Sequence, residues 1–176
     1  MYRSFDLFAD GSCKGSNKPG GWANILRITR DDGVIDEAEY SGGDSATTNN
    51  RMELYAVLHG LDTINKMCSS INCEHSVVVR DVPVRVISDS SYVVHGMNKW
   101  LEGWIRRKWK TASGKPVKNR DLWEQLYIIT KQLTIEAIWV AGHIGHPENE
   151  RCDKKAKEET TKMLKKCLEK KNGSTV

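Results

Sequence analysis

The sequence lacks an apolar run long enough to cross a membrane as a helix, so we expect no membrane partner. Its first thirteen residues lack the apolar core of a secretory signal, because Asp6 and Asp10 interrupt them, and they are more typical of a strand. The five cysteines are odd in number and irregularly spaced, which argues against a disulfide framework. These absences predict a protein of a reducing compartment, the cytoplasm.

Internal repeats and low-complexity linkers are also missing, so nothing divides the chain into several parts. A length of 176 residues, 39% of them hydrophobic and 28% charged, suits one globular domain with its own core. We therefore predict a single domain over residues 1–171 and a frayed tail over residues 172–176. Nothing in the sequence requires more than a monomer.

The net charge of +4 is distributed unevenly along the chain. Residues 99–120, which we name the basic handle, contain eight Lys or Arg residues and one acidic residue, whereas the rest of the chain carries 19 basic and 22 acidic residues. Trp100, Trp104 and Trp109 lie within the handle. Basic residues attract polyanions and aromatic rings stack on bases or sugars, so the handle predicts a nucleic-acid interface. The alternative is a solvated helix face with an ordinary run of charge.

Turn signals and apolar periodicity predict an α/β fold. Apolar runs mark five strands, at residues 5–10, 22–28, 34–41, 84–87 and 134–140. Helical spacing of apolar residues marks helices at residues 54–64, 91–97, 100–109, 120–132 and 147–168. Three consecutive hairpin strands followed by alternating helices and strands imply a mixed sheet. Its first three strands are expected to be antiparallel, with helices on both faces.

Residues 67–82 do not follow either periodicity, and we interpret them as an enlarged loop or an extra strand around residues 77–79. Cys68, Cys73 and His75 within this segment could suggest a zinc site. Their spacing lacks a fourth ligand and a standard pairing, so we predict no zinc there.

Four acidic residues each have an ordinary structural explanation. Asp10 could end its strand in a turn, and Glu53 could pair with Asn50 in a capping box. Asp89 could cap the helix that follows its strand, and Asp153 could favour the positive start of the last helix. Taken singly, each position favours the structural explanation.

Taken together, the same four positions predict a metal site. Asp10 lies in the first strand, and Asp89 lies at the carboxyl end of a later strand, where α/β sheets place ligands. Glu53 and Asp153 fall in the first turns of helices that can pack over those strands. Converging carboxylates repel one another without a cation, and hard oxygen ligands suit Mg²⁺ or Mn²⁺. Two such ions about 4 Å apart can activate a water and stabilise a leaving oxygen on phosphate.

The sequence resembles the type 1 ribonuclease H family, including its basic protrusion. The resemblance rests on stretches that occur in the family's order: residues 10–15 (DGSCKG), 48–54 (TNNRMEL), 88–93 (SDSSYV), 108–111 (KWKT), 116–123 (PVKNRDLW) and 142–153 (GHIGHPENERCD). The last stretch is the most specific. The resemblance implies the family's fold, a five-stranded mixed sheet flanked by helices.

The resemblance also implies a reaction. The family's members are endonucleases that hydrolyse the RNA strand of an RNA–DNA hybrid, leaving 5′-phosphate and 3′-hydroxyl ends. By resemblance, Asp10, Glu53, Asp89 and Asp153 hold two Mg²⁺ ions, for which Mn²⁺ can substitute. His143, in the glycine-flanked loop 142–145, is assigned an assisting role in proton transfer or product release. Without the resemblance, a structural role for His143 is equally open.

Contacts with the RNA strand are implied for residues near the first strand and the first helix. By resemblance, Cys13, Gly15, Asn49 and Asn50 lie along this strand, where they sense the 2′-hydroxyl that distinguishes RNA from DNA. After the glycine, many bacterial relatives carry Asn. This chain has Ser16 followed by Asn17, so the contact at that point falls to one of the two.

The basic handle is implied to grip the DNA strand. By resemblance, Trp104 packs against a deoxyribose, and Thr48 with Asn119 holds a DNA phosphate. The salt-sensitive part of the affinity is assigned to four basic side chains, Arg106, Arg107, Lys108 and Lys110. The remaining tryptophans, Trp100, Trp109 and Trp123, are expected to hold the handle to the body.

Two other functions stay open at this point. The first is a catalytically silent module that binds hybrids through the handle, although the presence of all four acidic residues argues against it. The second is another nuclease of the same fold that acts on DNA. Cleavage rates on hybrid, duplex DNA and duplex RNA separate these possibilities.

Overall fold

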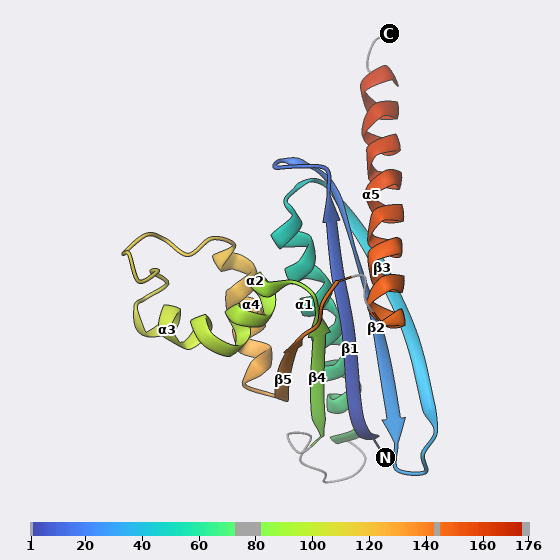
Figure 1. The fold of residues 1–176 in the computed structure, drawn as a ribbon, viewed down its shortest axis with the longest axis vertical. Coiled ribbons are helices and arrows are strands. Elements are labelled where there is room, and N and C mark those ends of the chain that lie inside the picture. The colour runs from blue at the N-terminus through green and yellow to red at the C-terminus, as the bar shows by residue number, and fades with distance from the viewer. Residues whose placement is uncertain (1, 73–81, 143–144, 174–176) are drawn as a thin grey trace.

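The computed structural model describes residues 2–72, 82–142 and 145–173 and is built around one five-stranded sheet. Its strands are β1 (Tyr2–Cys13), β2 (Lys18–Arg30), β3 (Ile35–Thr47), β4 (Pro83–Ser88) and β5 (Thr134–Trp139). The strand order is β3-β2-β1-β4-β5, with antiparallel pairing among the first three strands and parallel pairing of β4 with β1 and β5 (Figure 1). The predicted mixed sheet is therefore confirmed.

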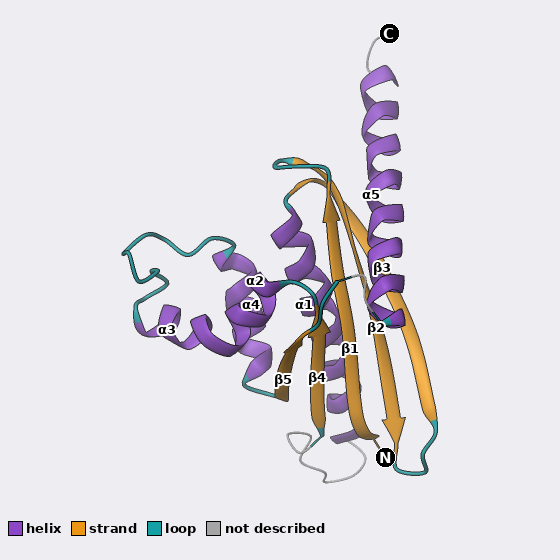
Figure 2. Ribbon diagram, in the orientation of Figure 1, coloured by secondary structure: helices purple, strands orange, loops and turns teal. Residues whose placement is uncertain are grey.

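Helices cover both faces of the sheet (Figure 2). They are α1 (Asn49–Asn72), α2 (Ser91–His95), α3 (Leu101–Arg106), α4 (Arg120–Thr130) and α5 (Pro147–Gly173), with a π-helical turn, η2, at Gly96–Trp100. Alternate residues of β1 point to opposite faces, as a strand requires. Leu7 packs in the larger core with α1 and α4, whereas Phe8 packs in a smaller core with Cys152 and Ala156 of α5. The segment between α3 and α4 projects away from the sheet.

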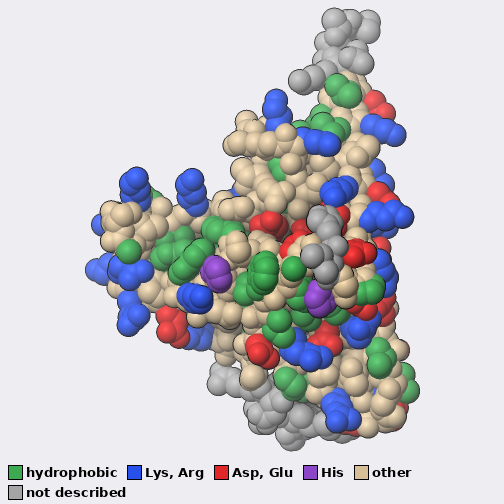
Figure 3. All heavy atoms as spheres, viewed as in Figure 1, with side chains coloured by type: hydrophobic (Ala, Val, Ile, Leu, Met, Phe, Trp, Pro, Cys, Tyr) green, Lys and Arg blue, Asp and Glu red, His purple; other side chains and the backbone are tan. Residues whose placement is uncertain are grey.

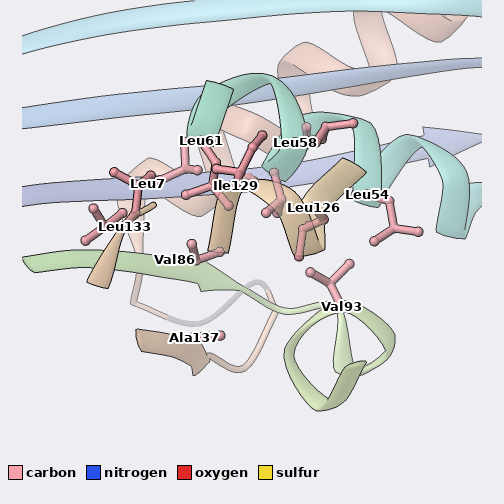
Figure 4. Packing of buried hydrophobic residues seen from close by; sticks show 14 of the residues in the cluster. Leu7, Leu54, Leu58, Leu61, Val86, Val93, Leu126, Ile129, Leu133 and Ala137 are labelled. Carbon is pink, nitrogen blue, oxygen red and sulfur yellow. The ribbon is translucent and has the colours of Figure 1, made fainter. Parts of the chain in front are cut away.

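The larger core holds α1 and α4 against β1 and β4. Leu54, Leu58 and Leu61 recur at helical spacing on α1 and meet Leu126 and Ile129 of α4 (Figure 4). Because β1 has helices on both sides, its middle is buried throughout, which fits a central strand. No described helix is both long and apolar enough to cross a membrane.

The enlarged loop predicted for residues 67–82 is wrong in its first part. Helix α1 continues to Asn72 because the apolar repeat does not stop at Ile64: Cys68, four residues later, is 2% exposed and packs in the larger core. The Cys68 thiol is thus a core group. The proposed alternative strand at 77–79, together with Cys73 and His75, lies outside the described residues.

The helix predicted for residues 100–109 is also too long. Helix α3 ends at Arg106, and Lys108 and Trp109 adopt left-handed backbone conformations with φ of 52° and 63°. The Trp109 amide donates to the Trp104 carbonyl (2.7 Å), which closes the end of the helix. At the other end of the chain, α5 reaches Gly173 and so enters the segment predicted as a frayed tail.

Candidate active site

Asp10 lies in the interior of β1 and is only 7% exposed. Its Oδ1 accepts a hydrogen bond from the Gly11 amide (2.7 Å). Burial raises the pKa of Asp10 to about 8, and the negative charges of Asp89, Asp153 and Glu53 add to this effect. Asp10 therefore does not end its strand in a turn. It is a buried carboxyl on which the fields of three other acidic residues act.

Asp89 follows the last residue of β4, beside Asp10. The parallel register pairs Phe8 with Ile87, and two residues further along the chain lie Asp10, still in β1, and Asp89, just beyond β4. The helix after β4 is capped by Ser90, whose Oγ accepts from the Val93 amide, so Asp89 is not the predicted cap. Gly142 approaches closely from the loop after β5, because a Cβ there would lie 2.7 Å from Asp89 Oδ2.

Glu53 extends from the first turns of α1 toward the same end of the sheet. Its Oε2 accepts from Ser90 Oγ (2.6 Å), and its Oε1 accepts from Asn49 Nδ2 (2.7 Å). Burial raises the pKa of Glu53, and the charge of Asp89 adds to the rise. The start of α1 is capped by Thr48, whose hydroxyl accepts from the Arg51 amide (3.4 Å). Glu53 is therefore not the partner of Asn50 in a capping box.

Asp153 lies in the second turn of α5 and is half-buried. Its Oδ2 accepts from Lys157 Nζ (2.6 Å), one helical turn further along. The neighbouring Cys152 is buried and directs its thiol toward the Phe8 carbonyl (3.5 Å), and Thr160 donates to the Ser12 carbonyl (3.1 Å). These two contacts fix α5 against β1 and so set the position of Asp153 relative to Asp10.

The four carboxylates come from four elements and influence one another electrostatically. In Figure 3, acidic side chains gather between the basic handle and α5. Within residues 2–72, 82–142 and 145–173, no three His, Cys, Asp or Glu side chains are already close enough to hold one metal ion. The oxygens of Glu53 and Asp153 are turned to Ser90, Asn49 and Lys157, as expected for like charges that repel.

The chemistry of this donor set fits a divalent cation. Carboxylate oxygens are the hard ligands that Mg²⁺ and Mn²⁺ prefer. A cation would also offset the repulsion that raises the pKa of Asp10. His143, predicted to assist catalysis, lies outside the described residues.

The residues predicted to contact RNA surround the same end of the sheet. Gly15, Ser16 and Asn17 form the exposed turn between β1 and β2, with Gly15 and Asn17 at positive φ. The half-buried Cys13 precedes this turn, and its thiol points toward the Gly15 carbonyl (2.9 Å). Asn49 and Asn50 are exposed at the start of α1, although the Asn49 amide is already bonded to Glu53.

Comparison with known proteins shows the family of the chain. The family model described as RNase H matches residues 3–161. A ribonuclease H of Xanthomonas oryzae pv. oryzae (strain MAFF 311018) is 42% identical over 159 residues, which cover 90% of this chain and 93% of that protein. The chain belongs to the ribonuclease H family. A second relative, a ribonuclease H of Nitratidesulfovibrio vulgaris (strain DP4), is 47% identical over 148 residues, 84% of this chain and 83% of that protein.

Solved structures of ribonucleases H share the fold. LC9-RNase H1, described as a type 1 RNase H with the type 2 active-site motif, gives a TM-score of 0.72 at 27% identity over 93% of this chain and 74% of that one. LC11-RNase H1 in complex with an RNA/DNA hybrid gives a TM-score of 0.58 at 22% identity over 92% and 99% of the two chains. The predicted family, fold and enzyme class are thus confirmed: the protein is a ribonuclease H.

The handle of this ribonuclease H is basic outside and aromatic inside. Arg106, Arg107, Lys108 and Lys110 are all exposed. Trp104 is only 7% exposed and packs edge-on against Trp123, with ring centroids 5.3 Å apart, whereas Trp100 is 37% exposed. Trp104 therefore has little free surface for the predicted deoxyribose contact, which stays a prediction.

The two residues predicted to hold a DNA phosphate lie at helix starts. Asn119 precedes α4, has a left-handed backbone and donates to the Tyr92 hydroxyl (3.2 Å). Thr48 caps α1 through the hydroxyl described above. Arg51, in the first turn of α1, pairs with Asp121 in the first turn of α4 (2.7 Å). This ion pair links the start of α1 to the start of α4, so both predicted phosphate contacts rest on connected elements.

Sequence reasoning missed the neighbours that hold the acidic residues in place. Ser90 was part of a matched stretch, but only the structure shows its hydroxyl on Glu53. Trp139, the last residue of β5, donates from its indole nitrogen to the Asp89 carbonyl (3.0 Å). The spacing of residues along the sequence predicts neither hydrogen bond, because each joins residues from different parts of the chain.

Proposed function

We propose that this ribonuclease H cleaves the RNA strand of RNA–DNA hybrids with the help of two divalent metal ions, Mg²⁺ or Mn²⁺. The observation that carries the proposal is that buried Asp10 lies within the electrostatic field of Asp89, Asp153 and Glu53, which add to the rise in its pKa. The family membership and the hybrid complex of the structurally similar LC11-RNase H1 support the choice of substrate.

In the proposed reaction, water adds to the phosphorus atom of an RNA phosphodiester and the bond to the 3′ oxygen breaks. The products are a 5′-phosphate and a 3′-hydroxyl, whose proton comes from the water. Asp10, Glu53, Asp89 and Asp153 would hold the ions, which when bound supply an activated water and neutralise charge on the phosphate. Ser90 and Asn49 each hold one carboxylate oxygen of Glu53 and so fix the orientation of its side chain.

Substrate selection is assigned to the surfaces on either side of the carboxylates. Exposed Asn50 and the turn at Gly15–Asn17 offer amide and backbone groups that can both donate to and accept from a 2′-hydroxyl. On the other side, the handle offers positive charge to DNA phosphates. His143 is proposed to assist proton transfer or product release.

We also place the protein in a reducing compartment, since Cys13, Cys68, Cys152 and Cys167 are free thiols.

The function is tested by one cleavage experiment on labelled substrates. Equal concentrations of RNA–DNA hybrid, duplex RNA and duplex DNA are incubated with the protein, each with Mg²⁺ and with excess chelator. We expect cleavage of the RNA strand of the hybrid alone, its loss with chelator, and fragments that carry 5′-phosphate ends. Preferential cleavage of duplex DNA, or hybrid cleavage that persists in chelator, would contradict the proposal.

The gripping role of the handle predicts a change in salt dependence. Replacing Lys108 and Lys110 by Gln removes two exposed charges, and each lost phosphate contact reduces the slope of log affinity against log salt by about 1. Hybrid affinity should be measured at several salt concentrations. The matched control replaces Lys66 and Lys131, which lie outside the handle, by Gln. If both double variants reduce the slope equally, attraction is diffuse and the handle has no special role.

A further inference from the structure

Trp139 is an unusual residue for the end of an edge strand. Its side chain is 53% exposed although it is large and aromatic, and it ends β5, the outermost strand next to β4 (Figure 1). Its one polar atom is nevertheless engaged, because Nε1 donates to the Asp89 carbonyl at 3.0 Å. The indole is therefore held by a hydrogen bond at the carboxylates rather than by burial.

The hydrogen bond from Trp139 to Asp89 lies just beyond the last backbone pairing between β4 and β5. Pairing of β4 with β5 ends at Ser88 and Trp139, and the Val140 amide donates to the Ser88 carbonyl (3.2 Å). Asp89 lies one residue beyond this ladder. Its carbonyl depends on the indole for the support that β5 backbone groups give to the residues before it.

The peptide group that accepts the Trp139 hydrogen bond is also connected to Glu53 through Ser90. The Asp89 carbonyl belongs to the peptide bond that joins Asp89 to Ser90, and Ser90 Oγ donates to Glu53 Oε2 at 2.6 Å. A rotation of this peptide would move the Asp89 side chain and the Ser90 hydroxyl together. The amide of this peptide already donates to Ser88 Oγ (3.2 Å), and the Trp139 bond restrains its carbonyl, so the indole acts on a peptide that carries Asp89 and leads to the hydroxyl on Glu53.

We propose that Trp139 is a positioning residue, which holds the Asp89–Ser90 peptide so that Asp89 and Glu53 face a shared divalent cation. The inference rests on the proposed function for the cation, but it concerns this chain's own hydrogen bond. Outer partners that orient the groups binding a metal change metal affinity or activity by about 10-fold to 100-fold when removed. An exposed indole that restrains only one peptide should lie at the low end of that range.

The test uses Mg²⁺ alone as the probe and the full chain. Thermal unfolding midpoints are measured over a series of Mg²⁺ concentrations, from which an apparent Kd follows for each variant. Trp139→Phe keeps an aromatic ring and removes the donor, and we expect its apparent Kd to rise about tenfold. Trp139→His restores a ring N–H at the same distance from the backbone, so at about pH 8, where imidazole is neutral, its Kd should return to within about twofold of the parent.

The matched control is Asn98→Ala. Asn98 Nδ2 donates to the Ala137 carbonyl (2.8 Å), which is also a side-chain bond to a carbonyl at this edge of the sheet but not to an acidic residue of the site. We expect it to lower the unfolding midpoint and leave the Mg²⁺ Kd unchanged. Equal Kd values for Trp139→Phe and the parent, or an equal rise in Asn98→Ala, would overturn the proposal.

A cleavage assay on the hybrid completes the design. Trp139→Phe should need more Mg²⁺ for half-maximal rate, with the KM for hybrid unchanged at saturating Mg²⁺. A raised KM in Trp139→Ala with a normal Mg²⁺ Kd in Trp139→Phe would make the ring a substrate contact and would overturn positioning. Should the parent bind Mg²⁺ but cleave no hybrid, the proposed function fails while the Mg²⁺ titration still decides the role of Trp139.

Discussion

Replacing Asp10 by Asn should abolish hybrid cleavage while the protein still binds hybrid. If Asp10 helps to hold the proposed ions, the change removes several kcal/mol of transition-state stabilisation, a loss of about a thousandfold in rate. Binding should persist because we assign it to the handle and the exposed turn rather than to the carboxylates. Single-turnover cleavage and a filter-binding or fluorescence measurement of hybrid affinity check the two halves of this prediction.

The same variant should be more stable than the parent when chelator is present. The pKa of Asp10 is raised from 3.8 to about 8 in the folded protein, so folding favours the protonated carboxyl. The parent therefore loses stability as pH rises from about 4 toward 8, and the amide avoids this loss. At about pH 8 a shift of this size corresponds to as much as about 5 kcal/mol in the free energy of unfolding, and the gain should disappear near pH 4.

Asp6→Asn is the matched control, because Asp6 is a second buried aspartate on β1. Asp6 forms a paired set of hydrogen bonds with Arg85 (2.6 and 2.7 Å), so its loss should lower stability and leave cleavage intact. The two variants are thus expected to shift stability in opposite directions and activity in only one. An Asp10→Asn protein that cleaves hybrid at the parent's rate would end the metal-site proposal.

Much of the fold could be predicted because its signals are local. The strand at residues 5–10 and the helical repeat from Leu54 to Ile64 follow from the spacing of apolar residues, and both occur in the structure. The errors arose where local signals weaken. Cys68 continues the repeat of α1 as a small apolar residue, and Lys108 and Trp109 take backbone conformations that no residue-type preference predicts.

In the candidate site, too, the sequence predicts individual acidic residues, but it does not predict the tertiary contacts that hold them. Asp10 and Asp89 could be selected because the first lies in a recognisable strand and the second directly follows one, and these two strands pair in parallel. The hydrogen bonds to Glu53 from Ser90 and to Asp89 from Trp139 could not be predicted. Each depends on how β4, β5 and α1 meet, which is decided by packing over long sequence separations.

Gly11→Ala should be strongly destabilising, because Gly11 is where β1 and α1 touch through their backbones. A Cβ at Gly11 would lie 2.3 Å from the Glu53 amide nitrogen and 2.6 Å from the Met52 carbonyl carbon. Both are backbone atoms of α1, which packs in the larger core, so the helix as a whole must move. Overpacking of this kind costs about 3 kcal/mol of unfolding free energy, which urea denaturation measures.

Gly11→Ala should also reduce hybrid cleavage. The backbones of β1 and α1 can approach at Gly11 because this residue has no side chain, so moving α1 outward should separate Glu53 from Asp10 and remove cleavage in whatever protein remains folded. Gly103→Ala is the matched control: the three atoms nearest to its Cβ belong to the mobile guanidinium end of Arg107, the first at 2.8 Å, and alanine favours the helix by up to about 1 kcal/mol. If Gly11→Ala is as stable as the parent, α1 can move away from β1 at little cost, which contradicts the first expectation. If that protein also cleaves hybrid, the close contact at Gly11 is not needed to position the carboxylates.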